Sequence, residues 1–201
     1  MPLLNSGSTR IVLASQSPRR IELLEKIVPE FEVRVSNIVE NNNGVSVPWK
    51  LVEQLSRKKA ESVAQQIPKG IIIGADSVVV LNGKILGKPK DPRDSFTMLN
   101  LLSDNIHQVY TGFTLIKNPD SVVISDHEVT QVRFRKLEAW EIKLYVESGQ
   151  SLDKAGSYGI QDDGAVFVES INGCYYNVVG LPIAKLFLAL KNLLNREEGK
   201  N

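Results

Sequence analysis

Residues 11–27 read IVLASQSPRRIELLEKI, and this stretch predicts a buried strand, a short loop and a helix in direct succession. The apolar run Ile11–Leu13 suits a strand, and apolar residues then recur at helical spacing from Ile21 to Ile27. Ser17 is a favoured N-cap residue, and the proline that follows it fits the first position of a helix. The stretch therefore predicts a strand–loop–helix arrangement near the start of the chain.

Two arginines lie at the unfavourable end of this predicted helix. Arg19 and Arg20 fall in its first turn, where the helix dipole is positive and a cation costs roughly 0.3–1 kcal/mol. Both side chains could simply point into water, where salt screens the penalty. Alternatively, an anion completes the site, because backbone N–H groups, serine hydroxyls and guanidinium groups that converge on one place suit a phosphate or polyphosphate.

Strand and helix patterns mix along the rest of the chain, which predicts an α/β fold with a largely mixed sheet. Hairpins are expected at Asn82-Gly83, around KNPDS at 117–121, and at Asn172-Gly173, since Asn-Gly is a favoured two-residue turn. The polar, turn-rich residues 37–48 are expected to form a mobile flap. A buried strand is expected at 71–80, and further helices at 48–67, 91–103, 137–148 and 181–194.

The composition is that of a globular protein, with 42% hydrophobic and 23% charged residues among 201. A net charge of +1 gives no reason to expect nucleic acid or an anionic membrane as a partner. No apolar stretch approaches the roughly 18 residues that span a bilayer, and the first ten residues lack the core of a signal peptide. The single cysteine, Cys174, excludes an internal disulfide and a cysteine-rich zinc site, so we expect a cytoplasmic protein.

Two charged residues fall at positions that should be buried. Asp76 interrupts the apolar run IIIGADSVVV, where an ionised carboxylate needs a metal, a cation or a local kink that exposes it. Lys59 falls near the middle of the apolar stripe of the predicted helix 48–67. Asp76 is either a turn-bonding acid or a metal ligand or base, and Lys59 either snorkels to the surface or points into a cleft.

Three further residues are weaker candidates when each is taken alone. Lys88 and the proline after it lie in LGKPKD, and Glu40 lies in the predicted flap, where solvated glutamates are usual. Gln161 ends the glycine-rich stretch DKAGSYGIQ, and its amide offers a donor and an acceptor for reading a base edge. The two histidines are far apart in the sequence, and neither a Ser-His-Asp arrangement nor a Gly-x-x-x-x-Gly-Lys phosphate loop is present.

Taken in order, several segments resemble the Maf family of septum-formation-inhibitor-like nucleotide pyrophosphatases. The resemblance covers about residues 10–190 and rests on LASQSPRRIELL, GADSVV, LGKPKD, DKAGSYGIQ and NVVGLP. It implies cleavage of nucleoside triphosphates to the monophosphate and pyrophosphate, with a divalent cation, Mg²⁺ or Mn²⁺. It also implies an elongated α/β fold, like that of inosine triphosphate pyrophosphatases, with two lobes around a central cleft and a mixed sheet flanked by helices.

The resemblance assigns roles to individual positions of this chain. Catalytic roles fall to Asp76, Glu40, Lys59 and Lys88, and the carboxylates of Glu40 and Asp76 are the expected metal ligands. Substrate binding falls to Ser15, Arg19, Arg20, Ser77 and Gln161. Arg19 and Gln161 resemble the branch of the family that acts on dTTP and UTP, rather than the branch that acts on 7-methyl-GTP.

The chain departs from the family pattern at three positions. Ser77 stands where this branch commonly has threonine, and it keeps the hydroxyl group. Gln150 stands where an acid is common, which removes one carboxylate from any metal scheme. Asp162 stands where glycine is common, and it adds charge beside the expected base-reading residue, Gln161.

The sequence thus predicts a nucleoside triphosphate pyrophosphatase with a preference for dTTP and UTP. Residues 1–201 are expected to form a single Maf-like domain of two lobes, with flexible termini at about 1–9 and 196–201. The expected partner is a nucleoside triphosphate, without nucleic acid or membrane, and a homodimer is one expected oligomeric state. The alternative is a nucleotide-binding regulator of cell division that turns nothing over, which would need the arginine and lysines but no acidic residues.

Overall fold

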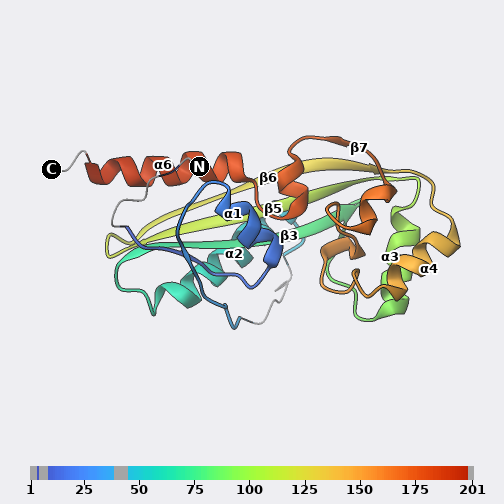
Figure 1. Cartoon of the computed structure of the whole chain (residues 1–201), viewed down its shortest axis with the longest axis horizontal. Coiled ribbons are helices and arrows are strands. Elements are labelled where there is room, and N and C mark those ends of the chain that lie inside the picture. Colours follow the sequence, from blue (N-terminus) through green and yellow to red (C-terminus); the bar gives the residue numbers. More distant parts are fainter. Residues whose placement is uncertain (1–3, 5–8, 39–44, 199–201) are drawn as a thin grey trace. The chain divides into compact units, whose positions relative to one another are not determined.

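Helices and strands mix along the whole chain in the computed structural model, which describes residues 4, 9–38 and 45–198 (Figure 1). The strands are β1 (Ile11–Leu13), β2 (Glu32–Val33), β3 (Gly70–Leu81), β4 (Lys84–Leu86), β5 (Ile106–Asn118), β6 (Val122–Phe134) and β7 (Val168–Asn172). The helices are α1 (Pro18–Glu25), α2 (Pro48–Ala64), α3 (Pro92–Leu102), α4 (Ala139–Glu147), α5 (Tyr175–Val179) and α6 (Ile183–Glu198). Two 3₁₀ helices, η1 (Ala155–Ser157) and η2 (Asp163–Phe167), precede β7.

The strands form one mixed seven-stranded sheet in the order β2-β1-β3-β5-β6-β7, with β4 paired to β3 beside this path. β1 runs parallel to both β2 and β3, whereas β4 runs antiparallel to β3 and β7 antiparallel to β6. Parallel pairs need crossover connections and antiparallel pairs can use tight turns, so a mixed sheet follows from a chain that has both. The predicted α/β fold with a mixed sheet and flanking helices is confirmed.

The chain divides into two compact units. Unit 1 comprises residues 1–76, 111–128 and 180–201, and unit 2 comprises residues 77–110 and 129–179. The boundaries fall inside β3, β5 and β6, so each of these strands contributes residues to both units.

Unit 1 is built around the close packing of α2 on the sheet. A Cβ atom at Gly74 would lie 2.1 Å from the carbonyl oxygen of Ser56, and one at Gly112 would lie 2.6 Å from the carbonyl carbon of Val52. Only glycine lets the backbone of α2 approach β3 and β5 this closely. In Figure 1, the strands of this unit run between α2 and α6.

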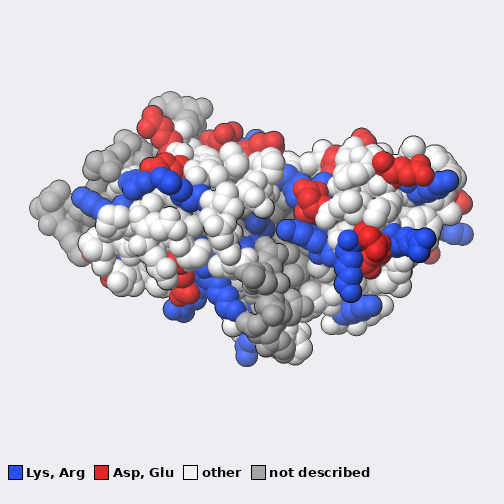
Figure 2. Space-filling view, turned by 90° about the horizontal axis from the view of Figure 1, so that it is seen from below, with Lys and Arg blue, Asp and Glu red and all other residues white. Residues whose placement is uncertain are grey.

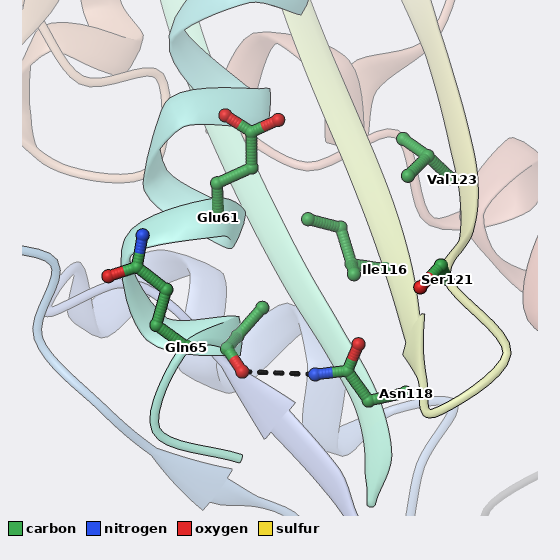
Figure 3. A pocket seen from close by; sticks show the side chains of 7 residues that line it. Glu61, Gln65, Ile116, Asn118, Ser121 and Val123 are labelled. Carbon is green, nitrogen blue, oxygen red and sulfur yellow. Dashed lines mark hydrogen bonds between the residues drawn. The ribbon is translucent and has the colours of Figure 1, made fainter. Parts of the chain in front are cut away.

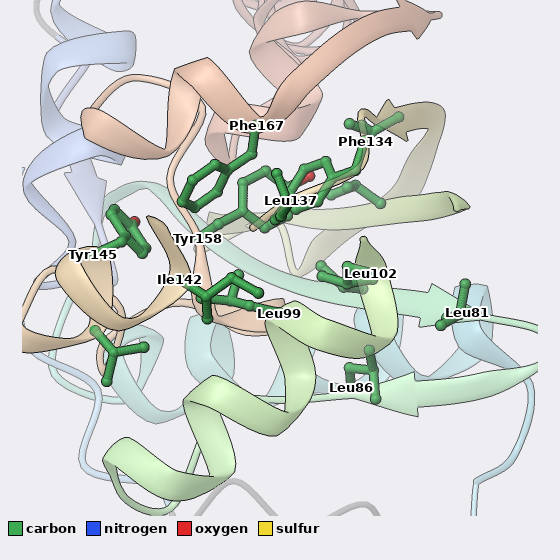
Figure 4. Close-up of a cluster of buried hydrophobic side chains, with 14 residues drawn as sticks. Leu81, Leu86, Leu99, Leu102, Phe134, Leu137, Ile142, Tyr145, Tyr158 and Phe167 are labelled. Atoms are coloured by element: carbon green, nitrogen blue, oxygen red, sulfur yellow. The ribbon is translucent and has the colours of Figure 1, made fainter. Parts of the chain in front are cut away.

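Unit 2 has its own aromatic core, against which residues of α3 and α4 pack (Figure 4). Phe134 packs edge to face against Tyr158 and Phe167, with ring centroids 4.6 and 5.9 Å apart. Leu99, Leu102 and Ile142 from the two helices are fully buried in the same cluster. The side chains of this cluster come from segments far apart in the sequence, which fixes the loops that lie between them.

The sequence predicts hairpin turns at two Asn-Gly pairs, and the structure contains one of these turns but not the other. Asn82 and Gly83 have φ angles of 49° and 77° and join β3 to β4, as predicted. The hairpin predicted at Asn172-Gly173 is wrong, because β7 pairs with β6 and the chain then enters α5. Asn177 in α5 is completely buried and donates to the carbonyl of Val109 and the hydroxyl of Thr130, so tertiary contacts decide this segment.

Charged side chains of both signs share the surface. On the face shown in Figure 2, acidic residues lie among the basic ones, in keeping with the net charge of +1. Within the described part of the chain, no helix has the length and apolar character needed to cross a membrane.

Candidate active site

The loop between β1 and α1 presents the predicted anion-binding residues. Arg19 and Arg20 lie in the first turn of α1, as the sequence predicts, and both are partly buried. Ser17 occupies the N-cap position, but its side chain accepts no hydrogen bond from the helix. Instead, the backbone N–H of Ser17 donates to the hydroxyl of the buried Ser15 over 3.2 Å. The loop is therefore held by Ser15, and the first turn of α1 contains no acidic residue of its own.

Arg20 also has a structural contact that the sequence does not reveal. Its Nε donates to the carbonyl oxygen of Gly180 over 2.9 Å, across 160 positions of sequence. Gly180 has a φ angle of +127°, a conformation that disfavours other residues, and it lies in the NVVGLP segment. Two of the segments on which the family resemblance rests are thus joined in unit 1, and the guanidinium is oriented by the carbonyl.

Lys59 and Asp76 form a buried ion pair in unit 1. The Nζ atom of Lys59 lies 2.5 Å from Oδ1 of Asp76, and the two side chains are only 10% and 8% exposed. The sequence left open whether Asp76 is matched by a metal, a cation or a kink, and the structure supplies the cation. Lys59 likewise turns inward and does not snorkel to the surface.

Local sequence explains how the two charges meet. Lys59 belongs to the buried face of α2, next to Ala60 and one turn from Leu55 and Val63. Asp76 lies in a strand that is buried at almost every position, which is typical of strands covered on both faces. Because Gly74 lets α2 approach β3 closely, a lysine on the buried face of the helix reaches a carboxylate on the strand.

A second group of predicted residues lies in unit 2. Lys88 is exposed in the loop after β4, and Ser77 is partly buried in β3. The N–H of Gly156 donates to the carbonyl of Gly87 over 3.0 Å, which ties the Lys88 loop to η1. Gly156 has a φ angle of +69°, and a Cβ there would lie 2.7 Å from the Val79 side chain. Lys88 is thereby held next to the DKAGSYGIQ segment.

Gln161 lies exposed in the turn between η1 and η2. The neighbouring Asp162, which is expected to add charge beside Gln161, is held by several groups of unit 2. Its Oδ1 accepts from the hydroxyl of Tyr145 and from the N–H of Gly164, both over 2.9 Å. Its Oδ2 lies 3.2 Å from the ammonium of Lys154, so the carboxylate is engaged within the loop.

The predicted site residues thus fall into separate groups. Ser15, Arg19, Arg20, Lys59 and Asp76 belong to unit 1, and Ser77, Lys88 and Gln161 belong to unit 2. Among the described members, the structure joins Lys59 directly to Asp76. Glu40, predicted as a catalytic residue and metal ligand, lies outside the described residues.

Asp76 suits the divalent cation implied by the resemblance. Mg²⁺ and Mn²⁺ prefer oxygen ligands, and a buried carboxylate is such a ligand. Lys59 places a positive charge beside this carboxylate, and an ionised carboxylate is the form that metal binding requires. The donor chemistry of the described part of the site therefore fits the cation through Asp76.

Sequence reasoning missed another cluster of metal-type ligands in unit 1. Glu53, Asp126 and His127 each offer a ligand atom, and these atoms lie within 4.8 Å of one another. His127 stacks on Trp49, and its Nδ1 is 2.6 Å from Glu53, 74 positions away, a separation that hides the pairing from the sequence. Lys185 approaches Asp126 to 3.9 Å, so hydrogen bonds and ion pairs within the protein already account for this cluster.

A pocket at the end of α2 does not coincide with any predicted site residue. It has a volume of about 420 Å³ and lies between the end of α2 and the β5–β6 hairpin (Figure 3). Asn118 crosses this region and donates to the carbonyls of Ala64 and Ile67 over 3.0 and 2.7 Å. These bonds fasten the hairpin to the helix, so Asn118 is a structural residue of unit 1.

The fold places the chain in a known class of α/β proteins. It matches the structure of the Staphylococcus aureus Ham1 protein with a TM-score of 0.53 and 18% sequence identity, covering 92% of this chain and 99% of that one. At this identity the match concerns the fold alone, and it agrees with the fold class that the sequence predicts.

The sequence comparisons then identify the family. The family described as Maf-like protein matches residues 10–193, and the chain belongs to this family. A protein of Clostridium perfringens named dTTP/UTP pyrophosphatase is 51% identical over 185 residues, covering 91% of this chain and 96% of its own length. A protein of Carboxydothermus hydrogenoformans with the same name is 50% identical over 182 residues, covering 90% and 97%.

Proposed function

We propose that this protein hydrolyses dTTP and UTP to the nucleoside monophosphate and pyrophosphate. The observation that carries the proposal is the buried Lys59–Asp76 pair, found in a chain about half identical to proteins named dTTP/UTP pyrophosphatase. A buried ion pair contributes little net stability, because desolvation offsets the attraction. A role in chemistry explains why unit 1 contains one.

The residues of unit 1 serve the triphosphate. Arg20, oriented by the carbonyl of Gly180, and the N–H groups at the start of α1 bind phosphate oxygens. Arg19, in the same turn, adds charge or contacts the base. Lys59 helps to neutralise the phosphate oxygens while it pairs with Asp76. Positioning and charge stabilisation of this kind account for most of the catalysis of phosphoryl transfer.

The predicted residues of unit 2 bind both the phosphates and the base of the substrate. Lys88 neutralises further phosphate oxygens, and its loop is tied to η1 by the Gly156–Gly87 hydrogen bond. Gln161 reads the pyrimidine through its amide, which donates and accepts. Ser77 keeps the hydroxyl of the threonine that the dTTP-type branch commonly has, and it contributes to substrate binding.

The cofactor is Mg²⁺ or Mn²⁺, held by oxygen ligands from Asp76 and Glu40. When bound, such a cation polarises a phosphoryl oxygen and lowers the pKa of a water molecule. Asp76 either ligates the cation or accepts the proton of the attacking water as a general base. The reaction consumes one water, breaks the anhydride bond between the α- and β-phosphates, and releases a proton with the two products.

A pyrophosphate-release assay over UTP, dTTP, CTP, GTP and 7-methyl-GTP, with and without Mg²⁺ or Mn²⁺, tests the proposal. The expected result is metal-dependent release with the highest kcat/KM for dTTP and UTP. Absence of turnover with every nucleotide would favour the alternative of a nucleotide-binding regulator. The expected location is the cytoplasm, and a homodimer is the oligomeric state to test by light scattering.

A further inference from the structure

The turn that carries Gln161 is fastened by a compact polar network in unit 2. The hydroxyl of Tyr145, from α4, accepts from the N–H of Gly159 over 3.0 Å and donates to Asp162 over 2.9 Å. Asp162 also accepts from the N–H of Gly164 over 2.9 Å. The network therefore binds the backbone on both sides of Gln161, two residues before it and three residues after it.

The two glycines of this turn are required by the network itself. A Cβ at Gly159 would lie 2.1 Å from Oδ2 of Asp162, and a Cβ at Gly164 would lie 2.7 Å from the carbonyl oxygen of Gly159. The same Cβ at Gly164 would lie 3.2 Å from both the Asp162 carboxylate and the Tyr145 hydroxyl. The backbone thus closes around the carboxylate with no room for another side chain.

A lysine pairs with this carboxylate and with the carboxylate of Asp153. Lys154, whose side chain is 10% exposed, lies 3.2 Å from Asp162 and 2.8 Å from Asp153, and it also donates to the carbonyl of Gln150. Tyr145 is 4% exposed, and burial raises the pKa of its hydroxyl, so it stays a neutral donor. Asp162 is therefore held by a charge, a hydroxyl and a backbone amide at once.

The second departure from the family pattern lies against the same turn. The amide of Gln150 donates to the carboxylate of Asp163 over 2.7 Å. An acid at position 150 would face the Asp163 carboxylate and repel it, whereas glutamine supplies a donor. Gln150 and Asp162 therefore both stabilise the turn on which Gln161 lies.

We propose that Asp162, held by Tyr145 and Lys154, is a positioning residue that orients Gln161 for recognition of the pyrimidine base. This proposal rests on the proposed hydrolysis of dTTP and UTP, and it identifies residues that set the preference of that reaction for pyrimidine bases. Asp162 itself does not touch the substrate. It restricts the backbone on which the exposed Gln161 side chain is carried, and a preorganised hydrogen-bonding group discriminates among ligands better than a mobile one.

Amide hydrogen exchange of the free protein tests the network without any substrate. Tyr145→Phe removes the hydroxyl that accepts from Gly159, and Asp162→Ala removes the acceptor for Gly164. We expect exchange in residues 159–164 to become about tenfold faster or more in both variants, the effect of losing a hydrogen bond of ordinary strength. Unchanged exchange in this segment would overturn the proposal.

Steady-state kinetics test the link to specificity. Asp162→Ala should raise KM for UTP about tenfold, while kcat changes much less because the triphosphate contacts stay in place. The ratio of kcat/KM for UTP over CTP and GTP should fall. Asp162→Asn should lie between wild type and Asp162→Ala, because its amide oxygen still accepts from Tyr145 and Gly164.

Asp153→Asn is the matched control, since it removes a carboxylate from the same lysine but not from the network, and it should keep the wild-type ranking. If the wild-type protein hydrolyses UTP and the ranking is unchanged in Asp162→Ala, this inference is overturned and the proposed function stands. If the wild-type protein hydrolyses no triphosphate, the proposed function fails, and the inference fails with it.

Discussion

Each unit contains a buried pair of titratable groups that contact each other, and these two pairs differ in their charge. Unit 1 buries Lys59 and Asp76 as an ion pair, with Nζ and Oδ1 2.5 Å apart. Unit 2 buries His107 and Tyr158, whose Nε2 and Oη lie 2.7 Å apart, as neutral groups. Burial lowers the pKa of His107 to about 4 and raises the pKa of Tyr158, so neither is charged near neutral pH.

This difference in charge indicates that the neutral pair has a structural role and that the ion pair has a functional role. A neutral pair such as His107–Tyr158 places no charge in the core and packs among aromatic rings, with the ring centroids of His107 and Phe134 4.9 Å apart in an edge-to-face arrangement. An ion pair loses the hydration of two charges and contributes little in return. The charges of unit 1 are therefore the better candidates for chemistry, and the following variants test that contrast.

The largest effect is expected for Asp76→Asn, which keeps the volume of the side chain and removes its charge. Activity should fall roughly 10²–10⁴-fold, the range for loss of a positioned acid–base group. The sequence alone predicts that this variant keeps its fold, because asparagine has nearly the same size as aspartate. The structure adds that Lys59 is left buried without its carboxylate, which costs about 3–5 kcal/mol of unfolding free energy. Pyrophosphate release and denaturant unfolding measure the two effects.

The double variant Asp76→Asn/Lys59→Met is the control for this prediction. Replacing the lysine removes the buried positive charge that the Asp76 carboxylate balances in the wild type, so stability should recover toward the wild-type value while activity stays low. Turnover of UTP by Asp76→Asn at near the wild-type rate would show that Asp76 is structural.

The next largest effect concerns the stability of unit 2 at low pH. The His107 side chain is neutral in the folded protein and binds a proton more readily in the unfolded protein. Its contribution to the free energy of unfolding is therefore present in full above pH 6.5 and is lost as the pH falls toward about 4. The shift from 6.5 to about 4 corresponds to roughly 3 kcal/mol at the acid end. Unfolding curves between pH 7 and pH 4 should reveal this slope.

His107→Phe should flatten the slope in this pH window, because phenylalanine does not titrate. The variant should also be less stable at pH 7, since the Tyr158 hydroxyl loses its partner. An identical slope in wild type and variant would contradict the assignment of His107 as a buried neutral group.

Much of unit 1 could be predicted from the sequence, because its signals are local. The periodic burial of α2 singles out Lys59, and the apolar run of β3 singles out Asp76. The distance between them could not be predicted, since it depends on Gly74 letting the helix approach the strand. The hydrogen bond from Arg20 to Gly180 spans 160 positions and leaves no local pattern.

Parts of unit 2 could not be predicted either, because contacts between residues far apart in the sequence decide their structure. A turn signal at Asn172-Gly173 predicts a hairpin, yet the buried amide of Asn177 bonds to Val109 and Thr130 and favours a short helix. Asp162 was expected to alter the charge near Gln161. Its three partners come from α4, from the loop before η1 and from its own turn, and only the folded chain brings them together.

A smaller effect is expected for Arg20→Ala, which tests whether charge in unit 1 serves the ligand. Removing a cation from the first turn of α1 gains roughly 0.3–1 kcal/mol. Losing the hydrogen bond to Gly180 costs roughly 0.5–1.5 kcal/mol, so the melting temperature without nucleotide should change little. KM for UTP should rise about tenfold or more, because a charged phosphate contact is lost. A large drop in melting temperature with unchanged KM would mark Arg20 as purely structural.

The smallest effect on overall activity, and the sharpest on substrate choice, is expected for Gln161→Ala in unit 2. Gln161 is exposed, so its removal should leave the melting temperature unchanged within the error of the measurement. The contacts with the triphosphate persist, so hydrolysis of every nucleotide should continue. A site built to hydrogen-bond its ligand rejects one that leaves those groups unpaired, and without the amide the rates for UTP, dTTP, CTP and GTP should converge. Values of kcat/KM for these four and for 7-methyl-GTP, on wild type and variant, measure this convergence. An unchanged ranking, or a wild-type preference for 7-methyl-GTP, would remove Gln161 from base recognition and leave the buried charges of unit 1 as the basis of a pyrophosphatase with another specificity.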